Sequence, residues 1–325
     1  MVRWCDESEM AAALADGDDY LITAHQRADG DAIGALCAAI ELLSVMGKRV
    51  IAVSDDDSVD SRYAFLTAAH NIVPIRHLPP DRRPARALIL DAPVRERLGR
   101  VAAVLPPVAG ILVVDHHHTD QPIGALHLKE TAASSTCEIL FRLAARLATP
   151  LNSSIANSLY TGIVFDTGRF RFNNTTPNCL TAAAGLVAAG ADPVIVANRL
   201  YYDRSPSSVR LLGAALSSLV LEAGGRLASM VLSQDNLRQL EGQWEDLEGI
   251  IDYAISINGV DIAAFYKELK PGLVRISLRS RGEHSVRAIA QLLGGGGHDN
   301  AAGCQADGSP ADVRARVNAL IAARL

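Results

Sequence analysis

Short apolar runs alternate with longer amphipathic segments over residues 20–115, and this pattern predicts strands separated by helices. The strand-like runs are YLITA, KRVIAVS, RALIL and GILVV. The segment DAIGALCAAIELLSVMG between the first two is helix-like, and a shorter helix is expected near SRYAFL. Such alternation is typical of βαβ units in a mostly parallel sheet with flanking helices. We therefore predict an α/β fold for this part of the chain.

From Ser135 the pattern changes to long helical stretches, STCEILFRLAARL, SSIANSLYTGIVFD and TPNCLTAAAGLVAAG. Ser135 and Glu138 have the spacing of a capping box at the first of these helices. Turn-forming residues at Gly190–Pro193 and Asp203–Pro206 then interrupt the helical pattern. We expect the connection between two domains at this point.

The remainder reads as a smaller α+β domain. Strands are expected in GRLASMVLS, ISINGVDIAAFYKELK and LVRISLRS, and helices at SVRAIAQLL and from Pro310. A length of 325 residues also favours two domains. We predict a first domain over 1–190, a helical linker over 191–209 and a second domain over 210–325.

The composition, 49% hydrophobic and 21% charged, is that of an ordinary globular protein. A net charge of −5 argues against binding of long duplex nucleic acid, but it is compatible with a small phosphate ligand. No apolar run approaches the roughly 20 residues of a membrane span, and MVRWCDESEM lacks a signal-peptide pattern, so we expect a cytoplasmic protein without membrane contact. Five cysteines without C-x-x-C spacing argue against a disulfide framework or a structural zinc site.

Acidic residues and histidines follow several of the apolar runs. In an open parallel sheet, ligands collect at the carboxyl ends of the strands. Such mixed oxygen and nitrogen donors suit Mn²⁺ or a similar divalent metal. The candidates are His25, Asp29 and Asp31 after YLITA, Asp91 after RALIL, Asp115, His116 and His117 after GILVV, and Asp166 at the end of SLYTGIVFD.

Each of these motifs has a simpler structural alternative. Asp29 and Asp31 could cap the helix that follows, and Asp91 could do the same. Consecutive imidazoles after a buried strand have few structural uses, so the Asp115–His118 cluster is the more specific signal. The coincidence of four such motifs favours a metal site, although His118 has no assigned role.

The strand LVRISLRSR and the glycine run after it suggest an anion site in the second domain. Alternation places Arg275, Ser277, Arg279 and Arg281 on the face opposite Val274, Ile276 and Leu278. Consecutive backbone N–H groups of Gly294–Gly297 could form a nest for an anion, with His298 at its rim. Alternatively, the glycines form a flexible loop and the arginines a solvated face.

The motifs HQRADGD, LILDA, VVDHH, FDTGRF, SLRSRG and GGGGHDNAAG occur in this order over nearly the whole chain. Together they resemble the DHH phosphoesterase family with a DHHA1 domain, and within it the nano-RNase/pAp phosphatase group. One departure is Ala28, where the family commonly has proline before the first aspartate. Because no ligand is lost, this affects only the expected rigidity of the loop.

The resemblance implies two Mn²⁺ ions in an active site in the interdomain cleft. One ion is expected on His25, Asp29 and Asp91, and the other on Asp31, Asp91, His116 and Asp166. The resemblance further implies that His117 contacts the scissile phosphate and Asp115 orients the histidines, which makes Asp115, His116 and His117 the catalytic group. The substrate is then expected on His117, Arg279, Arg281, Gly295, Gly296, Gly297 and His298.

The implied activity is hydrolysis of short single-stranded oligoribonucleotides to 5′-mononucleotides, with dephosphorylation of pAp to AMP. A phosphodiesterase for cyclic di-AMP or pApA is an alternative within the same chemistry. An inorganic pyrophosphatase shares the first motifs, and a non-catalytic nucleotide sensor is an alternative of another class. The sequence leaves open the preferred substrate length, the direction of attack and whether the chain forms a homodimer.

Overall fold

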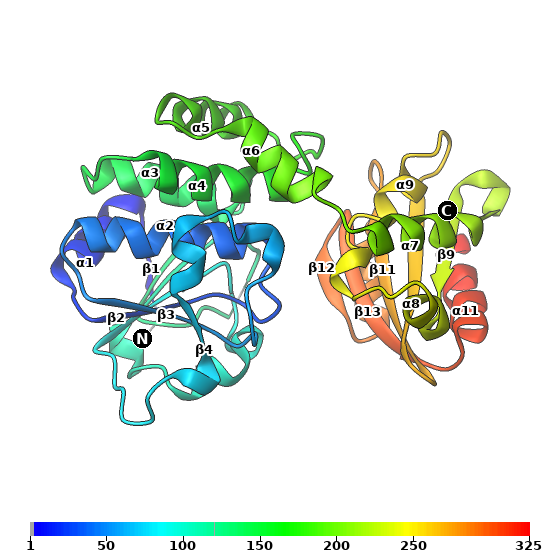
Figure 1. Ribbon diagram of the computed structural model, residues 1–325, viewed down its shortest axis with the longest axis horizontal. Coiled ribbons are helices and arrows are strands. Elements are labelled where there is room, and N and C mark those ends of the chain that lie inside the picture. Colours follow the sequence, from blue (N-terminus) through cyan, green and yellow to red (C-terminus); the bar gives the residue numbers. More distant parts are fainter. Residues whose placement is uncertain (1–2, 120) are drawn as a thin grey trace. The chain divides into compact units, whose positions relative to one another are not determined.

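The computed structural model describes residues 3–119 and 121–325, which belong to two compact units, Met1–Asp203 and Arg204–Leu325. The division falls inside the segment 191–209 in which we expected the linker. Each unit has a sheet and a hydrophobic core of its own (Figure 1).

The sheet of the first unit has seven parallel strands in the order β1-β7-β6-β5-β2-β3-β4. From β2 the chain adds β3 and β4 on one side, and it then returns to add β5, β6 and β7 on the other. The strand order therefore reverses between β2 and β5, the position at which open parallel sheets bind ligands. The strands are β1 Arg3–Trp4, β2 Tyr20–Thr23, β3 Val50–Ser54, β4 Ile72–Pro74, β5 Arg86–Leu90, β6 Ile111–Asp115 and β7 Leu126–Lys129.

The two faces of this sheet are covered differently. One face packs against α-helices in the main core, and the other packs against short 3-10 turns through Leu98 and Val101. Burial on both faces explains why the central strands are continuously apolar. The helices are α1 Glu7–Asp16, α2 Gly30–Val45, α3 Thr136–Arg146, α4 Ser153–Asp166, α5 Pro177–Ala188 and α6 Pro193–Ala197. The shorter elements are η1 Ser61–Tyr63, η2 Thr67–Asn71, η3 Ile75–His77, η4 Arg95–Ala103, η5 Val108–Gly110 and η6 Asn198–Tyr202.

Glycines bring α2 and α4 close together beneath the carboxyl ends of the strands. A Cβ on Gly34 would lie 2.4 Å from the Ser158 carbonyl oxygen. A Cβ on Gly162 would lie 2.3 Å from Cys137 Sγ and 2.5 Å from Asp31 Oδ1. Side chains at these positions would therefore displace α4 from the segment that holds Asp31.

The second unit contains a six-stranded mixed sheet in the order β12-β13-β11-β10-β9-β8, in which only β9 and β10 are parallel. Helices α10 and α11 contribute to the core on one face, and α7 and α9 to the core on the other. The strands are β8 Val220–Glu222, β9 Leu227–Leu232, β10 Ile262–Lys270, β11 Leu273–Ser280, β12 Gly296–His298 and β13 Ala301–Asp307. The helical elements are α7 Pro206–Ser217, η7 Ala223–Gly225, α8 Gln234–Gln239, η8 Glu245–Leu247, α9 Ile251–Ile255, α10 Val286–Leu292 and α11 Pro310–Ala322.

Among the described residues, no single helix has both the length and the apolar composition needed to cross a membrane. One pair of helical segments has this length and composition only when the two are taken together, and the pair is bent by 115° at the break between them. The segments are Pro177–Ala188 and Pro193–Tyr202.

His127 in β7 makes the stability of the first unit sensitive to acid. The residue is fully buried, and neither ring nitrogen has a hydrogen-bond partner among the residues that the structure describes. Burial lowers the pKa of His127 from 6.5 to about 4. The folded state therefore binds this proton less readily than the unfolded chain, so the contribution of His127 to stability is complete above about pH 6.5 and is lost as the pH falls toward 4.

We predict that the free energy of unfolding, measured in urea, falls by about 2 kcal/mol more between pH 7 and pH 5 in the native protein than in His127→Leu. Leucine fills a similar volume and does not titrate. Equal pH dependence of the two proteins would show that His127 is not the group responsible.

Candidate metal centre

Three adjacent strands in the middle of the first sheet, β6, β5 and β2, end at the same edge. His25 lies two residues beyond β2, Asp91 directly follows β5, and Asp115 is the last residue of β6. This confirms the prediction that buried strands deliver these residues at their carboxyl ends. Asp91 has a positive φ of 54°, an uncommon conformation that aspartate tolerates better than most residues and that turns the chain sharply after the strand.

The first group of side chains contains His25, Asp29 and Asp91. The Nε2 atom of His25 is buried, 3.7 Å from Asp29 Oδ2 and 3.4 Å from Asp91 Oδ2. One potential ligand atom from each residue lies within 4.8 Å of the others. The donor atoms are thus already directed at a common point.

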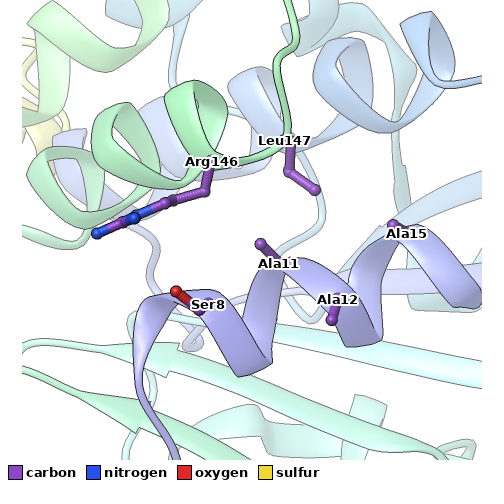
Figure 2. Close-up of a pocket in the computed structure, with 6 residues that line it drawn as sticks. All are labelled: Ser8, Ala11, Ala12, Ala15, Arg146 and Leu147. Carbon is purple, nitrogen blue, oxygen red and sulfur yellow. The ribbon is translucent and has the colours of Figure 1, made fainter.

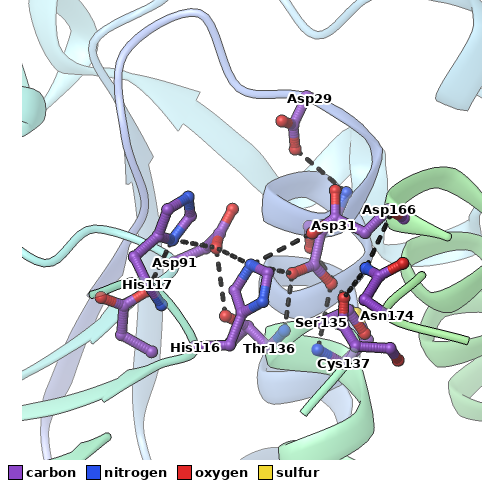
Figure 3. Close-up of polar contacts among 12 residues, drawn as sticks. Asp29, Asp31, Asp91, His116, His117, Ser135, Thr136, Cys137, Asp166 and Asn174 are labelled. Atoms are coloured by element: carbon purple, nitrogen blue, oxygen red, sulfur yellow. Dashed lines mark hydrogen bonds and ion pairs between the residues drawn. The ribbon is translucent and has the colours of Figure 1, made fainter. Parts of the chain in front are cut away.

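The second group contains Asp31, His116 and Asp166, the last of which ends α4. The Nε2 atom of His116 lies 3.1 Å from Asp166 Oδ2 and 3.9 Å from Asp31 Oδ2. Figure 3 shows His116 directed toward Asp31 and Asp91. The fold therefore brings together, in each group, side chains that are distant in the sequence.

Asp91 lies beside the histidines of both groups. Its Oδ2 atom faces His25, whereas its Oδ1 atom lies 3.5 Å from His116 Nε2. The hydroxyl of Thr136 donates to the same Oδ1 at 3.1 Å and helps to fix the carboxylate. Asp91 therefore lies where a carboxylate could be shared by two cations.

The capping alternative for Asp29 proves compatible with a ligand role. Asp29 is the N-cap of α2, and its Oδ1 accepts from the backbone N–H groups of Asp31 and Ala32, while Oδ2 faces His25. Asp31 is fully buried in the first turn of α2, and its carboxylate accepts from the N–H groups of Thr136 and Cys137 at 2.7 and 3.0 Å. These bonds place Asp31 at the positive end of α3.

The gathered charges shift the proton affinities of the acids. Burial raises the pKa of Asp31 well above its ordinary value, and Asp91 and Asp166 raise it further. Burial raises the pKa of Asp166 as well, although His116 offsets part of this effect. For Asp91, burial is outweighed by His117 and His25, which hold its pKa well below the usual value.

The imidazoles respond to the same charges. Burial lowers the pKa of His25, but Asp29 and Asp91 outweigh it and raise the value to about 10. A raised imidazole pKa at a buried position indicates a strongly negative potential, which also attracts divalent cations. The donor set, carboxylate oxygens with imidazole nitrogens, suits such cations, and the buried His/Asp groups are consistent with divalent metal binding.

His117 makes contacts different from those of His116. Asp115 is fully buried, and its Oδ1 accepts from the backbone N–H of His117 and lies 2.9 Å from His117 Nδ1. His117 also lies near Asp91 and His116. Its Nδ1 atom is engaged by Asp115, and its Nε2 atom lies 3.4 Å from Nη1 of Arg97. His118 is exposed and belongs to neither ligand group.

Asp56, which the sequence analysis missed, holds the loop that carries the first ligands. Its two carboxylate oxygens accept from the backbone N–H groups of Arg27 and Ala28 at 2.7 and 2.9 Å. Arg27 has a positive φ of 57°, so this loop is bent unfavourably for most residues. A proline at position 28 would have no N–H to donate. Ala28 therefore allows the hydrogen bond to Asp56 that a proline would remove.

Apart from His117, the residues predicted to hold substrate lie in the second unit, on β11, β12 and the segments next to them. The strand register pairs Arg279 with Ala301 and Ala301 with His298, so Arg279 and His298 share one row and one face of the sheet. Arg281 follows the end of β11, where its N–H donates to the Asp261 carbonyl at 2.8 Å.

The glycine run, for which we considered an anion nest or a flexible loop, is partly a strand. Gly296–His298 form the edge strand β12, and only Gly294 and Gly295 precede it. A Cβ on Gly295 would lie 2.2 Å from the Gly303 carbonyl oxygen, and one on Gly297 would lie 2.5 Å from that of Ala301. Close packing of β12 on β13 therefore accounts for part of the glycine content.

A pocket elsewhere in the first unit contains none of the predicted site residues. It lies between α1 and the end of α3, and Figure 2 shows the residues that line it, Ser8, Ala11, Ala12, Ala15, Arg146 and Leu147. This lining has none of the gathered acids and histidines of the metal centre.

Comparison with known proteins identifies the family. Residues 19–163 match the model of the DHH family N-terminal domain, and residues 227–324 match the DHHA1 domain. The bifunctional oligoribonuclease and PAP phosphatase NrnA of Thermus thermophilus is 34% identical over 315 residues, which cover 95% of this chain and 91% of that protein. The chain belongs to the DHH/DHHA1 family of phosphoesterases.

Two further similarities extend over most of this DHH/DHHA1 protein. The bifunctional oligoribonuclease and PAP phosphatase NrnA of Bacillus subtilis is 27% identical over 302 residues, covering 91% of this chain and 92% of that protein. The crystal structure of an exopolyphosphatase-related protein from Bacteroides fragilis covers 96% of this chain and 94% of its own, with a TM-score of 0.87 and 22% identity. The latter similarity supports the fold.

We predict that Asp56→Ala weakens Mn²⁺ binding about 10- to 100-fold, because loss of a group that orients ligands typically has an effect of this size. Affinity is measured by isothermal titration and retained metal by mass spectrometry. Asp57→Ala is the matched control, since Asp57 is exposed in the same loop and pairs with Arg76 instead. Equal metal affinity in the two variants would exclude a positioning role for Asp56.

Proposed function

We propose that this protein hydrolyses phosphoester bonds in short single-stranded oligoribonucleotides, releasing 5′-mononucleotides, and also removes the 3′-phosphate of pAp. The observation that carries the proposal is the position of Asp91 between two His/Asp groups, with one oxygen facing each group's histidine. Similarity to the NrnA proteins over nearly the whole chain supports the choice of substrates.

His25, Asp29 and Asp91 would hold one divalent cation, and Asp31, Asp91, His116 and Asp166 would hold the other. We expect Mn²⁺, because the donors combine carboxylate oxygens with imidazole nitrogens. When bound, a pair of such cations activates water as a nucleophile and neutralises charge on the attacking and leaving oxygens. The chain itself then has to fix the ligands, orient the phosphate and bind the rest of the substrate.

His117 would contact the scissile phosphate. Asp115 engages the backbone N–H and the Nδ1 atom of His117 and thereby holds the ring in an orientation in which Nε2 faces Arg97. The contact between Asp115 and His117 supports the expected orienting role of Asp115. His116, which faces Asp31, Asp91 and Asp166, would serve the metal instead.

The second unit offers a face suited to a nucleotide phosphate. Arg279 and His298 lie in one row of that face, and the next row contains Ser277, Gly303 and Gly296. Two glycines in that row leave the backbone accessible beside the side chains of Arg279 and His298. We propose that Arg279, Arg281, His298 and the backbone at Gly295, Gly296 and Gly297 bind the terminal phosphate or nucleotide.

The proposal is tested by giving the Mn²⁺-loaded protein pGpG, pApA, pAp, cyclic di-AMP and pyrophosphate in parallel. We expect turnover of the linear dinucleotides and pAp, with mononucleotides as products. Oligonucleotides of two to seven residues then define the preferred length. Turnover of pyrophosphate alone would contradict the proposal, cleavage of cyclic di-AMP alone would favour a cyclic dinucleotide phosphodiesterase, and no turnover at all would favour a nucleotide sensor.

Asp91→Asn is the matched inactive control for these assays. Asparagine keeps the tolerance for a positive φ but loses the negative charge at the shared position. Activity on every substrate should fall by at least about 100-fold while the far-ultraviolet circular dichroism stays native. Activity that persists in this variant would come from a contaminant or from a site that does not use Asp91.

We predict that Arg279→Ala raises KM for the dinucleotides about tenfold or more and leaves metal content unchanged, because a charge-assisted bond to phosphate is lost in the unit without the metal ligands. Arg316→Ala is the control, since it removes an arginine from α11, which packs on the opposite face of the same sheet. Metal loss in Arg279→Ala would contradict the assignment of this residue to substrate binding.

A further inference from the structure

Arg97 on η4 extends toward the metal centre, although no sequence motif identified it. Its Nη1 lies 3.4 Å from His117 Nε2. Among the residues that the structure describes, no carboxylate pairs with Arg97. The nearby acidic loop is engaged elsewhere: Asp55 bonds with Arg100, Asp56 with the backbone of the metal-binding loop, and Asp57 with Arg76.

The backbone on both sides of Arg97 is fixed by contacts with neighbouring segments, so the position of its Cα atom is well defined. Leu98 is fully buried in the core beneath the sheet. The carbonyl oxygen of Arg97 accepts from the Gln26 N–H at 2.7 Å, which ties η4 to the loop between His25 and Asp29. On the other side, Asp55 accepts from the Arg100 N–H at 2.8 Å.

Arg97 and His117 are close enough for both to contact one anionic oxygen. Nδ1 of His117 faces Asp115 and Asp91, which leaves Nε2 as the ring nitrogen that meets the guanidinium. An oxygen about 2.9 Å from both nitrogens would complete a triangle at ordinary hydrogen-bond lengths. A guanidinium is always charged and offers several N–H donors, the chemistry that recognises phosphate.

We propose that Arg97 is a further catalytic residue, which binds a non-bridging oxygen of the scissile phosphate together with His117. This inference rests on the proposed phosphoester hydrolysis. In that reaction the water oxygen forms a bond to phosphorus, the bond to the leaving ester oxygen breaks, and one water proton ends on that oxygen. The other proton goes to the phosphate product or to solvent. Arg97 transfers no proton and stabilises the negative charge that develops on the phosphate oxygens.

The test compares Arg97→Ala and Arg97→Lys with Arg95→Ala, an exposed arginine two residues earlier on η4 that bonds to the Ala102 carbonyl. In Arg97→Ala we expect kcat on pGpG and pAp to fall about 100-fold or more, with metal content and melting temperature unchanged. Added guanidinium ion should restore part of the lost rate, and Arg97→Lys should retain more activity than Arg97→Ala. Rates equal to those of Arg95→Ala would overturn the inference.

Equilibrium binding of inorganic phosphate to the Mn²⁺-loaded proteins gives a readout that needs no turnover. We expect Arg97→Ala to bind phosphate about tenfold or more weakly than the native protein, and Arg95→Ala to bind it normally. If neither nucleotides nor pAp are hydrolysed but this difference persists, the function proposed above fails and Arg97 remains a phosphate ligand. If nucleotides are hydrolysed and phosphate binding does not depend on Arg97, only this inference fails.

A second background separates direct contact from an effect through His117. In the His117→Ala protein, removal of Arg97 should still weaken phosphate binding, because the guanidinium is expected to contact the oxygen itself. Complete loss of the effect in that background would mean that Arg97 only positions His117 and would overturn the catalytic assignment.

Discussion

The mutual repulsion of four carboxylates gathered at one edge of the parallel sheet is the constraint on which the first unit depends. Burial raises the pKa of Asp31 and Asp166, and each additional acid raises the cost of ionising the others. The chain offsets this repulsion locally with histidines beside each group and with the N-terminal N–H groups of α3, which bind both oxygens of Asp31. Divalent cations are the natural counter-charge at such a position.

This constraint explains features of the surrounding structure that have no other evident purpose. Gly162 lets α4 approach Asp31 to a distance that any side chain would prevent. Asp56 fixes the bent loop between His25 and Asp29 through two backbone N–H groups. Asp91 itself adopts an uncommon backbone conformation directly after its strand. Uncommon backbone conformations and close packing thus occur where these side chains must be positioned within a fraction of an ångström.

Sequence patterns predicted the local structure well where hydrophobic periodicity was strong. The strands before His25, Asp91 and Asp115 and their parallel arrangement are confirmed. The expected capping box at α3 is half correct: Ser135 caps the helix, but the Glu138 side chain accepts from the Ser134 N–H instead of returning to Ser135. For the glycine run we considered a nest or a flexible loop and not a strand, because sequence periodicity does not show that the backbone would pair with β13.

The sequence alone determined which chemical groups the chain brings to the ends of its strands, because alternation of apolar runs and polar termini is a local property. Only the tertiary structure decided which of these groups meet. Three contacts depend on the order of strands in the sheet and on the packing of distant segments. Asp91 lies between His25 and His116, Asp56 binds the backbone of the loop between His25 and Asp29, and Arg97 approaches His117. Such contacts leave no periodic signal, since each partner is a single polar residue in a loop or at an element's end.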